Sequence, residues 1–375
     1  MSKKFLFLTV GLLAVVLLSA CGGGPVSGNT WPGLSATSDT AYLATGTFVY
    51  AVNANNGTQL WRYPGEREAD LLFFATPYVT EEGLVIVGSS GSDYSLVALD
   101  PGDINSETNA PAEAWRYTGA QDTWVAPPLA IENRLFAPNS DGNLYVFDLN
   151  DDQTNKQPIE VVELEGDLWA QPVTDGESLF VSSLDHSVFA IDLGTYDVLW
   201  HEDLGSAITS SPTLAADGNL YVGSFASKLE KFDPASGSHQ SVQDTRDWVW
   251  GMPSLVENNL YFGDLGGNLY SYNVENGQYE WEAALIPEDE DVKAITASPL
   301  VVEDILLVAT ESGAIYDVNK DGRFKNAPWT RLEGKIYTTP INVGDLVLVS
   351  PMNAEAALYA FDLTGRQAWA FTPEN

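Results

Sequence analysis

Cysteine, histidine and cationic residues are scarce in this chain of 375 residues. Cys21 is the single cysteine, so no disulfide can form within the chain. The three histidines, His186, His201 and His239, have no partner at the spacing of a metal site, and we expect no metal. Only 17 lysines and arginines stand against 52 aspartates and glutamates, a formal net charge of −35. A surface of that charge repels nucleic acids and excludes them as partners.

Helical periodicity is missing from residue 31 onward, where strand-sized apolar runs are bounded by Gly, Pro, Asn and Asp. The motifs of nucleophilic catalysis are missing too: there is no Gly-x-Ser-x-Gly segment, and no glycine-rich phosphate loop leads into a helix. Hydrophobic residues make up 45% of the chain and aromatic residues 11%, enough to fill a core. These features predict an all-β protein without catalytic activity.

An apolar run over residues 5–18 is too short for an ordinary membrane-spanning helix. Lys3 and Lys4 precede the run, and Leu18-Ser-Ala-Cys21 ends it. This arrangement resembles the lipobox of bacterial lipoproteins. The resemblance implies cleavage before Cys21 and lipidation of that cysteine, which would hold the protein at a membrane. The alternative is an ordinary signal peptide with a chance cysteine after it.

The chain is therefore expected to have three parts. Residues 1–20 are the predicted signal peptide, and the Gly-rich residues 21–30 are a lipidated, flexible tether. Residues 31–375 are the folded domain. We expect an exported protein, lipid-anchored to a bacterial membrane and facing the periplasm or the exterior.

A repeating unit fills residues 31–375. A proline begins each copy: Pro32, Pro77, Pro127 or Pro128, Pro172, Pro212, Pro253, Pro299 and Pro340. An Asp or Asn ends the third apolar run of each copy, at intervals of 40 to 48 residues: Asn53, Asp100, Asp148, Asp192, Asp233, Asn273, Asn319 and Asp362. In residues 211–237 the turn Asp217-Gly-Asn219 separates the first two runs as a hairpin signal. The eight copies predict an eight-bladed β-propeller of four-stranded antiparallel blades.

A tryptophan follows the second marker in six of the copies: Trp61, Trp115, Trp200, Trp281, Trp329 and Trp369. A single blade cannot bury both of its faces, so a large ring on the outer strand is expected to cover the gap to the next blade. Small residues such as Gly223, Gly263 and Ala309 are expected to leave room for it. We interpret these six tryptophans as blade-packing residues.

The segment Ala360-Phe-Asp-Leu-Thr-Gly-Arg-Gln-Ala-Trp369 resembles the quinoprotein-type (PQQ-like) propeller repeat, whose consensus ends in Ala-Phe-Asp-x-x-Thr-Gly-x-x-x-Trp. The resemblance covers about residues 31–372. It specifies the fold strongly and the function weakly, because this fold hosts several functions.

Two kinds of relative follow from this resemblance. Quinone-dependent dehydrogenases use such a propeller with calcium, a catalytic aspartate and, in several members, a disulfide between adjacent cysteines. This chain has no cysteine pair and no room for the long insertions of those enzymes. It is more similar to the BamB-type lipoproteins of outer-membrane assembly, which are propeller scaffolds without a cofactor. We therefore predict a protein-interaction scaffold with no cofactor, and a quinone enzyme or a ligand-sensing propeller remains the alternative.

Aromatic residues lie shortly before the proline in four copies, and acids precede them. The aromatic residues are Phe74, Trp124, Trp169 and Trp250, and the acids include Asp122, Asp167 and Asp247. If these segments lead into the innermost strands, the side chains surround one mouth of the central channel. The rings either pack on one another and plug the channel, or receive a basic or extended peptide or a small cationic ligand from a partner in the envelope.

Two acidic segments are candidate ion sites. Asp317-Val-Asn-Lys-Asp-Gly322 matches the start of a calcium loop, but its twelfth position is Pro328. It also coincides with the third-strand turn of a blade, so we predict a turn. The run Glu288-Asp-Glu-Asp291 is interpreted as a solvated loop.

Overall fold

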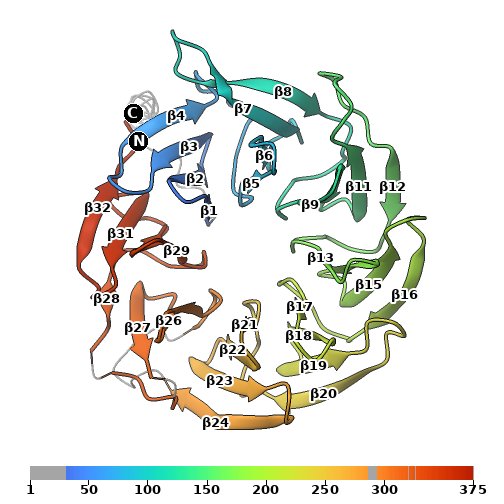
Figure 1. Ribbon diagram of the computed structural model, residues 1–375, viewed down its shortest axis with the longest axis vertical. Coiled ribbons are helices and arrows are strands. Elements are labelled where there is room, and N and C mark those ends of the chain that lie inside the picture. The colour runs from blue at the N-terminus through green and yellow to red at the C-terminus, as the bar shows by residue number, and fades with distance from the viewer. Residues whose placement is uncertain (1–30, 286–293, 320, 326, 375) are drawn as a thin grey trace, which may run out of the picture.

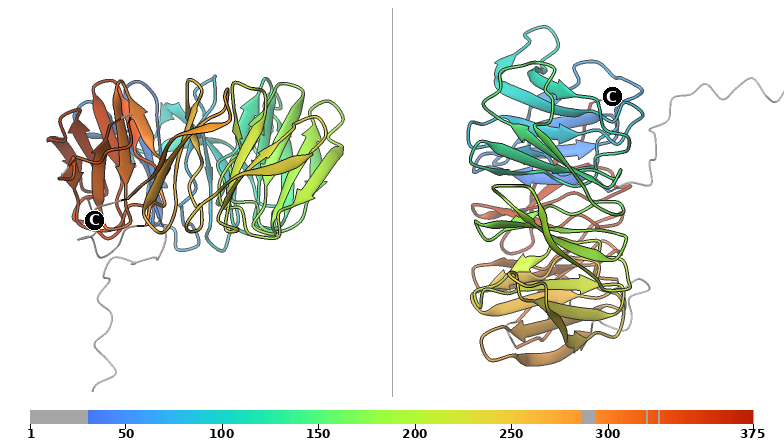
Figure 2. Two further views of the ribbon diagram at one scale, coloured as in Figure 1. Left: turned by 90° about the horizontal axis from the view of Figure 1, so that it is seen from below. Right: turned by 90° about the vertical axis from the view of Figure 1, so that its right-hand side faces the viewer.

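The computed structural model describes residues 31–374, apart from residues 286–293, 320 and 326. The described residues form 32 strands and no helix. The strands make eight four-stranded sheets, the blades, which stand around a common axis (Figure 1). From the side, the blades form a flat ring (Figure 2). The predicted eight-bladed propeller is confirmed.

Blade 1 contains β1 (Gly33–Ala36), β2 (Thr40–Thr45), β3 (Phe48–Asn53) and β4 (Gln59–Tyr63), and blade 2 contains β5 (Tyr78–Val79), β6 (Val85–Gly88), β7 (Leu96–Ile104) and β8 (Pro111–Tyr117). Blade 3 contains β9 (Leu129–Ile131), β10 (Arg134–Pro138), β11 (Asn143–Asp148) and β12 (Glu160–Glu163), and blade 4 contains β13 (Val173–Thr174), β14 (Ser178–Ser182), β15 (Ser187–Asp192) and β16 (Val198–Asp203).

Blade 5 contains β17 (Thr213–Leu214), β18 (Leu220–Ser224), β19 (Lys228–Phe232) and β20 (His239–Asp244), and blade 6 contains β21 (Ser254–Val256), β22 (Asn259–Gly263), β23 (Asn268–Asn273) and β24 (Gln278–Leu285). Blade 7 contains β25 (Leu300–Val302), β26 (Ile305–Ala309), β27 (Ala314–Val318) and β28 (Thr330–Arg331), and blade 8 contains β29 (Ile341–Val343), β30 (Leu346–Val349), β31 (Leu358–Asp362) and β32 (Gln367–Phe371).

Every blade is a meander in which four consecutive strands pair antiparallel, from the channel outward. In blade 5, β18 is buried along its whole length, because neighbouring blades cover both faces of a middle strand. The outermost strand β20 is mostly exposed. The residues between the outermost strand of one blade and the innermost strand of the next are called the lead-in segment below. These segments carry the candidate site.

The recurring Asp or Asn at the end of the third strand closes a tight turn. In blade 4, Asp192 Oδ1 accepts hydrogen bonds from the amides of Gly194 (2.8 Å) and Thr195 (2.7 Å). Both amides lower the pKa of Asp192, because they stabilise its charged form. The same acceptor geometry recurs at Asn53, Asp100, Asp148, Asp233, Asn273 and Asp362. The marker read from the sequence is thus an Asx turn.

Four of the six blade tryptophans, Trp200, Trp281, Trp329 and Trp369, reach across to this turn in the following blade. Trp200 of blade 4 donates its Nε1–H to the carbonyl of Pro234 in blade 5 (2.8 Å). Its ring covers Gly237, where an added Cβ would lie 2.8 Å from the indole. Gly237 also has a φ of +71°, so glycine is required there twice over. The pairs Trp281–Gly322 and Trp369–Gly57 repeat this contact.

The small residues on the second strands serve a different purpose from the one predicted. An added Cβ at Gly223 would lie 2.3 Å from Val249, and one at Gly263 would lie 2.3 Å from Ile295. Both contacts are with lead-in segments rather than with the blade tryptophans. The expectation that these glycines make room for the tryptophans is therefore wrong.

The ring closes by packing between blades 8 and 1. Trp369 of blade 8 donates to the carbonyl of Ala54 in blade 1 (3.1 Å), and Thr338 donates to the carbonyl of Pro32. All four strands of blade 8 come from one continuous segment, so no strand is shared across this junction. Pro32 and Pro373, close to the two ends of the described chain, line one pocket at this junction.

Candidate binding site at one mouth of the channel

The extended lead-in segments alternate between the core and the channel. Four residues before the proline, the side chain is almost completely buried between blades: Phe73, Trp124, Leu168, Ile208, Val249, Ile295 and Ile336. One residue later, the side chain faces the channel mouth in six of the segments: Phe74, Val125, Trp169, Thr209, Trp250 and Tyr337. This alternation follows from the period of two in an extended chain.

Trp124 does not reach the mouth, and the prediction for it is wrong. Pro128, not Pro127, directly precedes the innermost strand of blade 3. Trp124 therefore occupies the buried position of its segment, with 1% of its surface exposed, and Val125 takes the channel position. Gly88 makes this possible, because an added Cβ there would lie 2.3 Å from Cβ of Trp124.

Hydrogen bonds fix Trp124 to the loop between β6 and β7. Its indole N–H donates to the carbonyl of Tyr94 (2.7 Å), and Ser90 Oγ donates to its carbonyl (2.8 Å). In the same loop, Ser92 Oγ donates to Asp70 Oδ1 (2.9 Å). Trp124 thus anchors blade 2 to the lead-in segment of blade 3.

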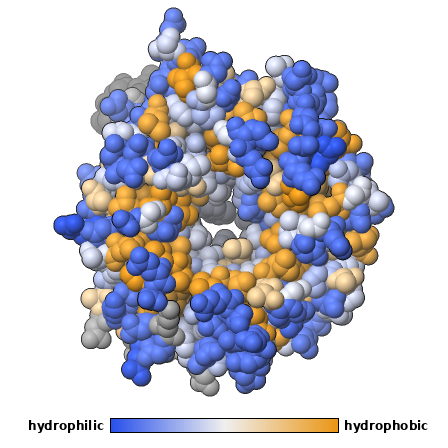
Figure 3. Space-filling view, viewed as in Figure 1, coloured by the Kyte–Doolittle hydropathy of each residue, from blue (hydrophilic) through white to orange (hydrophobic). Residues whose placement is uncertain are grey.

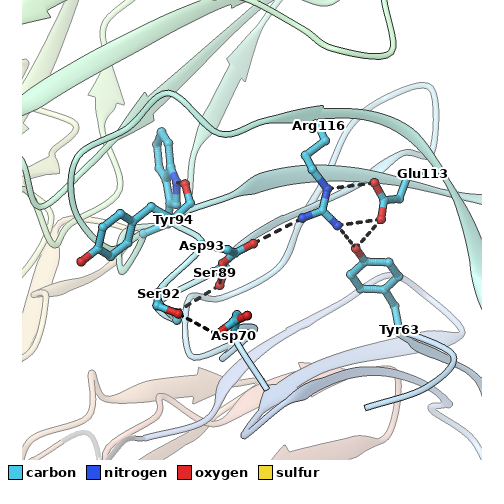
Figure 4. Close-up of polar contacts among 10 residues, drawn as sticks. Tyr63, Asp70, Ser89, Ser92, Asp93, Tyr94, Glu113 and Arg116 are labelled. Atoms are coloured by element: carbon cyan, nitrogen blue, oxygen red, sulfur yellow. Dashed lines mark hydrogen bonds and ion pairs between the residues drawn. The ribbon is translucent and has the colours of Figure 1, made fainter. Parts of the chain in front are cut away.

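An ion cluster continues this anchor toward the outer strands (Figure 4). Arg116 binds Glu113 with two hydrogen bonds (3.0 and 2.7 Å) and contacts Asp93 at 3.3 Å. Tyr63, from blade 1, donates to Glu113 Oε1 (2.6 Å). Burial opposes ionisation of Glu113, but the hydrogen bonds from Arg116 and Tyr63 outweigh it and lower its pKa. The cluster locks blades 1 and 2 together.

The channel mouth itself is an aromatic cluster around a small cavity. The ring centroid of Trp31 lies 5.9 Å from that of Trp169 and 6.4 Å from those of Trp250 and Tyr337. Between these rings and Phe74 remains a cavity of about 150 Å³. The rings pack on one another, as one alternative predicted, but they do not fill the mouth. Figure 3 shows the opposite face of the ring, where the channel is open at its centre.

From the cavity, stacked rings lead outward to the surface. Trp250 packs against Phe225 with a centroid distance of 5.6 Å, and Phe225 stacks on Trp248 at 4.8 Å. Trp248 is 48% exposed. Thr209 fixes the backbone of this segment by donating its Oγ1–H to the carbonyl of Trp250 (2.9 Å). A partner at the surface and a group in the cavity would thus contact one continuous aromatic series.

The predicted acids lie on the same lead-in segments as these rings. Burial raises the pKa of Asp167, and the nearby charge of Asp122 raises it further. Asp247 accepts the amide N–H of Trp248 (2.8 Å), and its own amide donates to the buried Asp264 (3.1 Å). The mouth therefore has a negative potential, and part of that charge is incompletely solvated.

Sequence reasoning missed two rings of the mouth. Tyr337 lies three residues before Pro340, the same offset as Phe74 and Trp169 from their prolines, so a strict count would have found it. Trp31 directly precedes Pro32 and breaks that count. Nothing in the spacing points to it.

Comparison with known families identifies the family of this chain. The sequence model of the outer membrane protein assembly factor BamB matches residues 14–243 and 239–371. The chain belongs to the BamB family.

Solved structures share the fold of this BamB-family chain at low sequence identity. BamB from Moraxella catarrhalis is 16% identical, with a TM-score of 0.65 over 87% of this chain and 92% of that one. The computationally designed Ika8 protein is 14% identical, with a TM-score of 0.70 over 90% of this chain and 98% of that one. Among curated proteins, none matches.

The other predicted sites of the BamB-family chain have these outcomes. Asp317 forms an ion pair with Lys325, within the turn that was predicted in place of a calcium loop. In the described part of the chain, no group of three His, Cys, Asp or Glu side chains is arranged to hold a metal ion. Cys21 and the run from Glu288 to Asp291 lie outside the described residues. None of the described residues belongs to a helix long and apolar enough to cross a membrane.

Proposed function

We propose that this protein is a non-catalytic scaffold for protein assembly in the cell envelope, working with the machinery that builds outer-membrane proteins. Membership of the BamB family supports this role, as does the propeller without large insertions. The predicted signal peptide and the lipid on Cys21 would export the protein and hold it at the membrane. The ring then presents loops to a partner from a fixed position.

The binding face is the channel mouth around Phe74, Trp169 and Trp250, with Trp31 and Tyr337 completing it. One observation carries this assignment: six lead-in segments, together with Trp31, converge on a cavity that their rings leave open. Rings needed only for packing would be buried, as Trp124 is. Large aromatic side chains are also enriched at the energetic centres of protein interfaces.

The acids Asp122, Asp167 and Asp247 favour a partner with a basic or extended segment. Opposite charge guides such a segment to the mouth and disfavours acidic competitors. Envelope or membrane proteins that carry such segments are the partners we propose. Nucleic acids are not among them, because the net charge of −35 repels phosphate.

In-cell crosslinking tests the role. A photo-crosslinking residue at position 248, beside the mouth, should capture proteins of the outer-membrane assembly machinery from native membranes. A matched probe at Leu199, which is exposed on the outer strand of blade 4, controls for proximity alone. Deleting the gene should also lower the amount of folded β-barrel proteins in the outer membrane. Crosslinks to unrelated proteins only, with unchanged barrel levels, would refute the proposal.

The quinone-enzyme and ligand-sensor alternatives have separate readouts. Reconstitution with pyrroloquinoline quinone and calcium should give no bound-cofactor absorbance if the protein is a scaffold. A screen of small neutral and acidic metabolites should give no thermal shift. A stoichiometric quinone spectrum with substrate-dependent reduction would replace the scaffold by a dehydrogenase.

A further inference from the structure

The mouth cavity has the walls of an aromatic cage. The rings of Trp169 and Trp250 both contact that of Trp31, and the ring of Trp250 is nearly perpendicular to that of Trp31, at 89°. Tyr337 contributes a further ring at 6.4 Å from Trp31. Rings inclined at 35° to 89° to Trp31 around a small space can present π faces to it. Such faces carry partial negative charge and attract cations within about 6 Å.

The charge around the cavity also favours a cation. The face of the ring that contains the mouth is formed by the lead-in segments and by the loops between the second and third strands. The described residues of these segments include 14 acidic and three cationic side chains. The three cations are Arg67, Arg246 and Lys335. Lys335 is already neutralised by Glu311, which also accepts a hydrogen bond from Tyr337 (2.7 Å). A cation entering the cavity therefore meets net negative charge.

The size of the cavity selects a single side chain. At about 150 Å³ it is similar to cavities that hold one benzene-sized group. A folded element or a lipid headgroup with its phosphate would not fit, and an anion would be repelled.

We propose that the channel mouth is a cage for one cationic side chain, lysine or arginine, supplied by the bound partner. This assignment rests on the proposed scaffold function and specifies the chemistry that the scaffold recognises. The cation would stack against Trp169 and Trp250, and Asp167 and Asp122 would attract it from the rim. The exposed Trp248 and the half-buried Phe225 would contact the partner's chain on either side of that residue.

Binding of blocked amino acids to the full-length protein tests the cage directly. N-acetyl-arginine methylamide and N-acetyl-lysine methylamide should quench tryptophan fluorescence in a saturable way. N-acetyl-citrulline methylamide has nearly the shape of the arginine probe without its charge, and it should bind at least about 10-fold more weakly. Equal binding of the arginine and citrulline probes would overturn the proposal.

Substitutions of the mouth residues show where the arginine probe binds. Trp169→Leu and Trp250→Leu remove one π face each and should weaken arginine binding about 10-fold. Trp169→Phe keeps a π face and should retain most of the affinity. Asp167→Asn should weaken binding by a smaller factor that shrinks with added salt. Loss of binding in Trp248→Ala with full binding in Trp250→Leu would place the cation on the outer surface and overturn the cage.

The two proposals fail separately. If assembly proteins still crosslink at position 248 while the arginine probe does not bind, the scaffold stands and the cage is wrong. If the probe binds but no assembly protein crosslinks and barrel levels are unchanged, the cage stands without the proposed scaffold role.

Discussion

Trp124 shows at the residue scale how one buried ring holds two blades together. Its side chain is 1% exposed, it lies against Gly88, and it donates a hydrogen bond to Tyr94. Replacing it with alanine leaves a cavity that the surrounding strands cannot fill. Trp124→Ala should therefore lower the free energy of unfolding by about 3–5 kcal/mol in urea denaturation.

Trp169→Ala is the matched control for this prediction. Trp169 has the same side chain on the next lead-in segment, but it faces the cavity and is only half-buried. Trp169→Ala should lower the free energy of unfolding by less than half as much as Trp124→Ala does. Its main effect should be weaker binding at the mouth. Equal destabilisation by the two changes would mean that the mouth rings are structural.

The candidate site could be predicted in part from single residues. Phe74, Trp169 and Trp250 lie where their offset from a proline placed them. Trp124 does not, because two consecutive prolines left the register open by one residue, and one residue reverses the direction of a side chain in an extended chain. The contact of Trp31 with the mouth depends on ring closure, which no local pattern encodes.

At the scale of the element, the β17–β18 hairpin depends on one carboxylate. Asp217 accepts hydrogen bonds from Lys231 (2.8 Å), the amide of Asn219 (3.1 Å) and the hydroxyl of Tyr221 (2.9 Å), and its side chain is 17% exposed. Burial opposes its ionisation, but these hydrogen bonds outweigh burial and lower its pKa from 3.8.

The sign of the pH dependence follows from that lowered pKa. The folded state favours the charged carboxylate, so its contribution is complete above about pH 4 and is lost as the pH falls through the folded-state pKa. Asp217→Asn should cost about 1 kcal/mol at pH 7, and the difference from the natural protein should shrink as the pH falls below about 4. Denaturant titrations at several pH values measure it. A difference that persisted in acid would show that the charge is not the cause.

The blades could be predicted because each carries its own complete set of signals. The Asx turn at Asp192, the hairpin turn at Asp217 and the tryptophan at position 200 all act within one copy or between neighbours. The role of Gly223 could not be read in this way. Its contact with Val249 joins a second strand to a lead-in segment 26 positions later, and the sequence gives no register between them.

At the scale of the whole molecule, seven junctions between blades are crossed by the chain and one is not. The lead-in segment from β16 to β17 ties blade 4 to blade 5, whereas blades 8 and 1 are joined only by packing and hydrogen bonds. The sequence predicted a closed ring of eight but not the manner of its closure. Both ends of the domain carry complete strand patterns, so a strand exchanged between the end blades was equally compatible with them.

The unlinked junction should be the point at which the ring opens. Trp369→Ala removes the hydrogen bond to Ala54 and the cover of Gly57, and nothing covalent then limits the separation of blades 8 and 1. Amide hydrogen exchange should therefore rise in both of these blades, including β1 and β32, while the other blades stay protected.

Trp200→Ala provides the comparison, because Trp200 makes the same hydrogen bond and glycine contact across a junction that the chain does cross. Its burial differs from that of Trp369, so the extent of the exposed region, rather than its rate, is the quantity to compare. Exchange in Trp200→Ala should rise only near the Pro234 turn and the outer strand of blade 4. If that change opened two whole blades as well, chain connectivity would have no part in holding the ring closed.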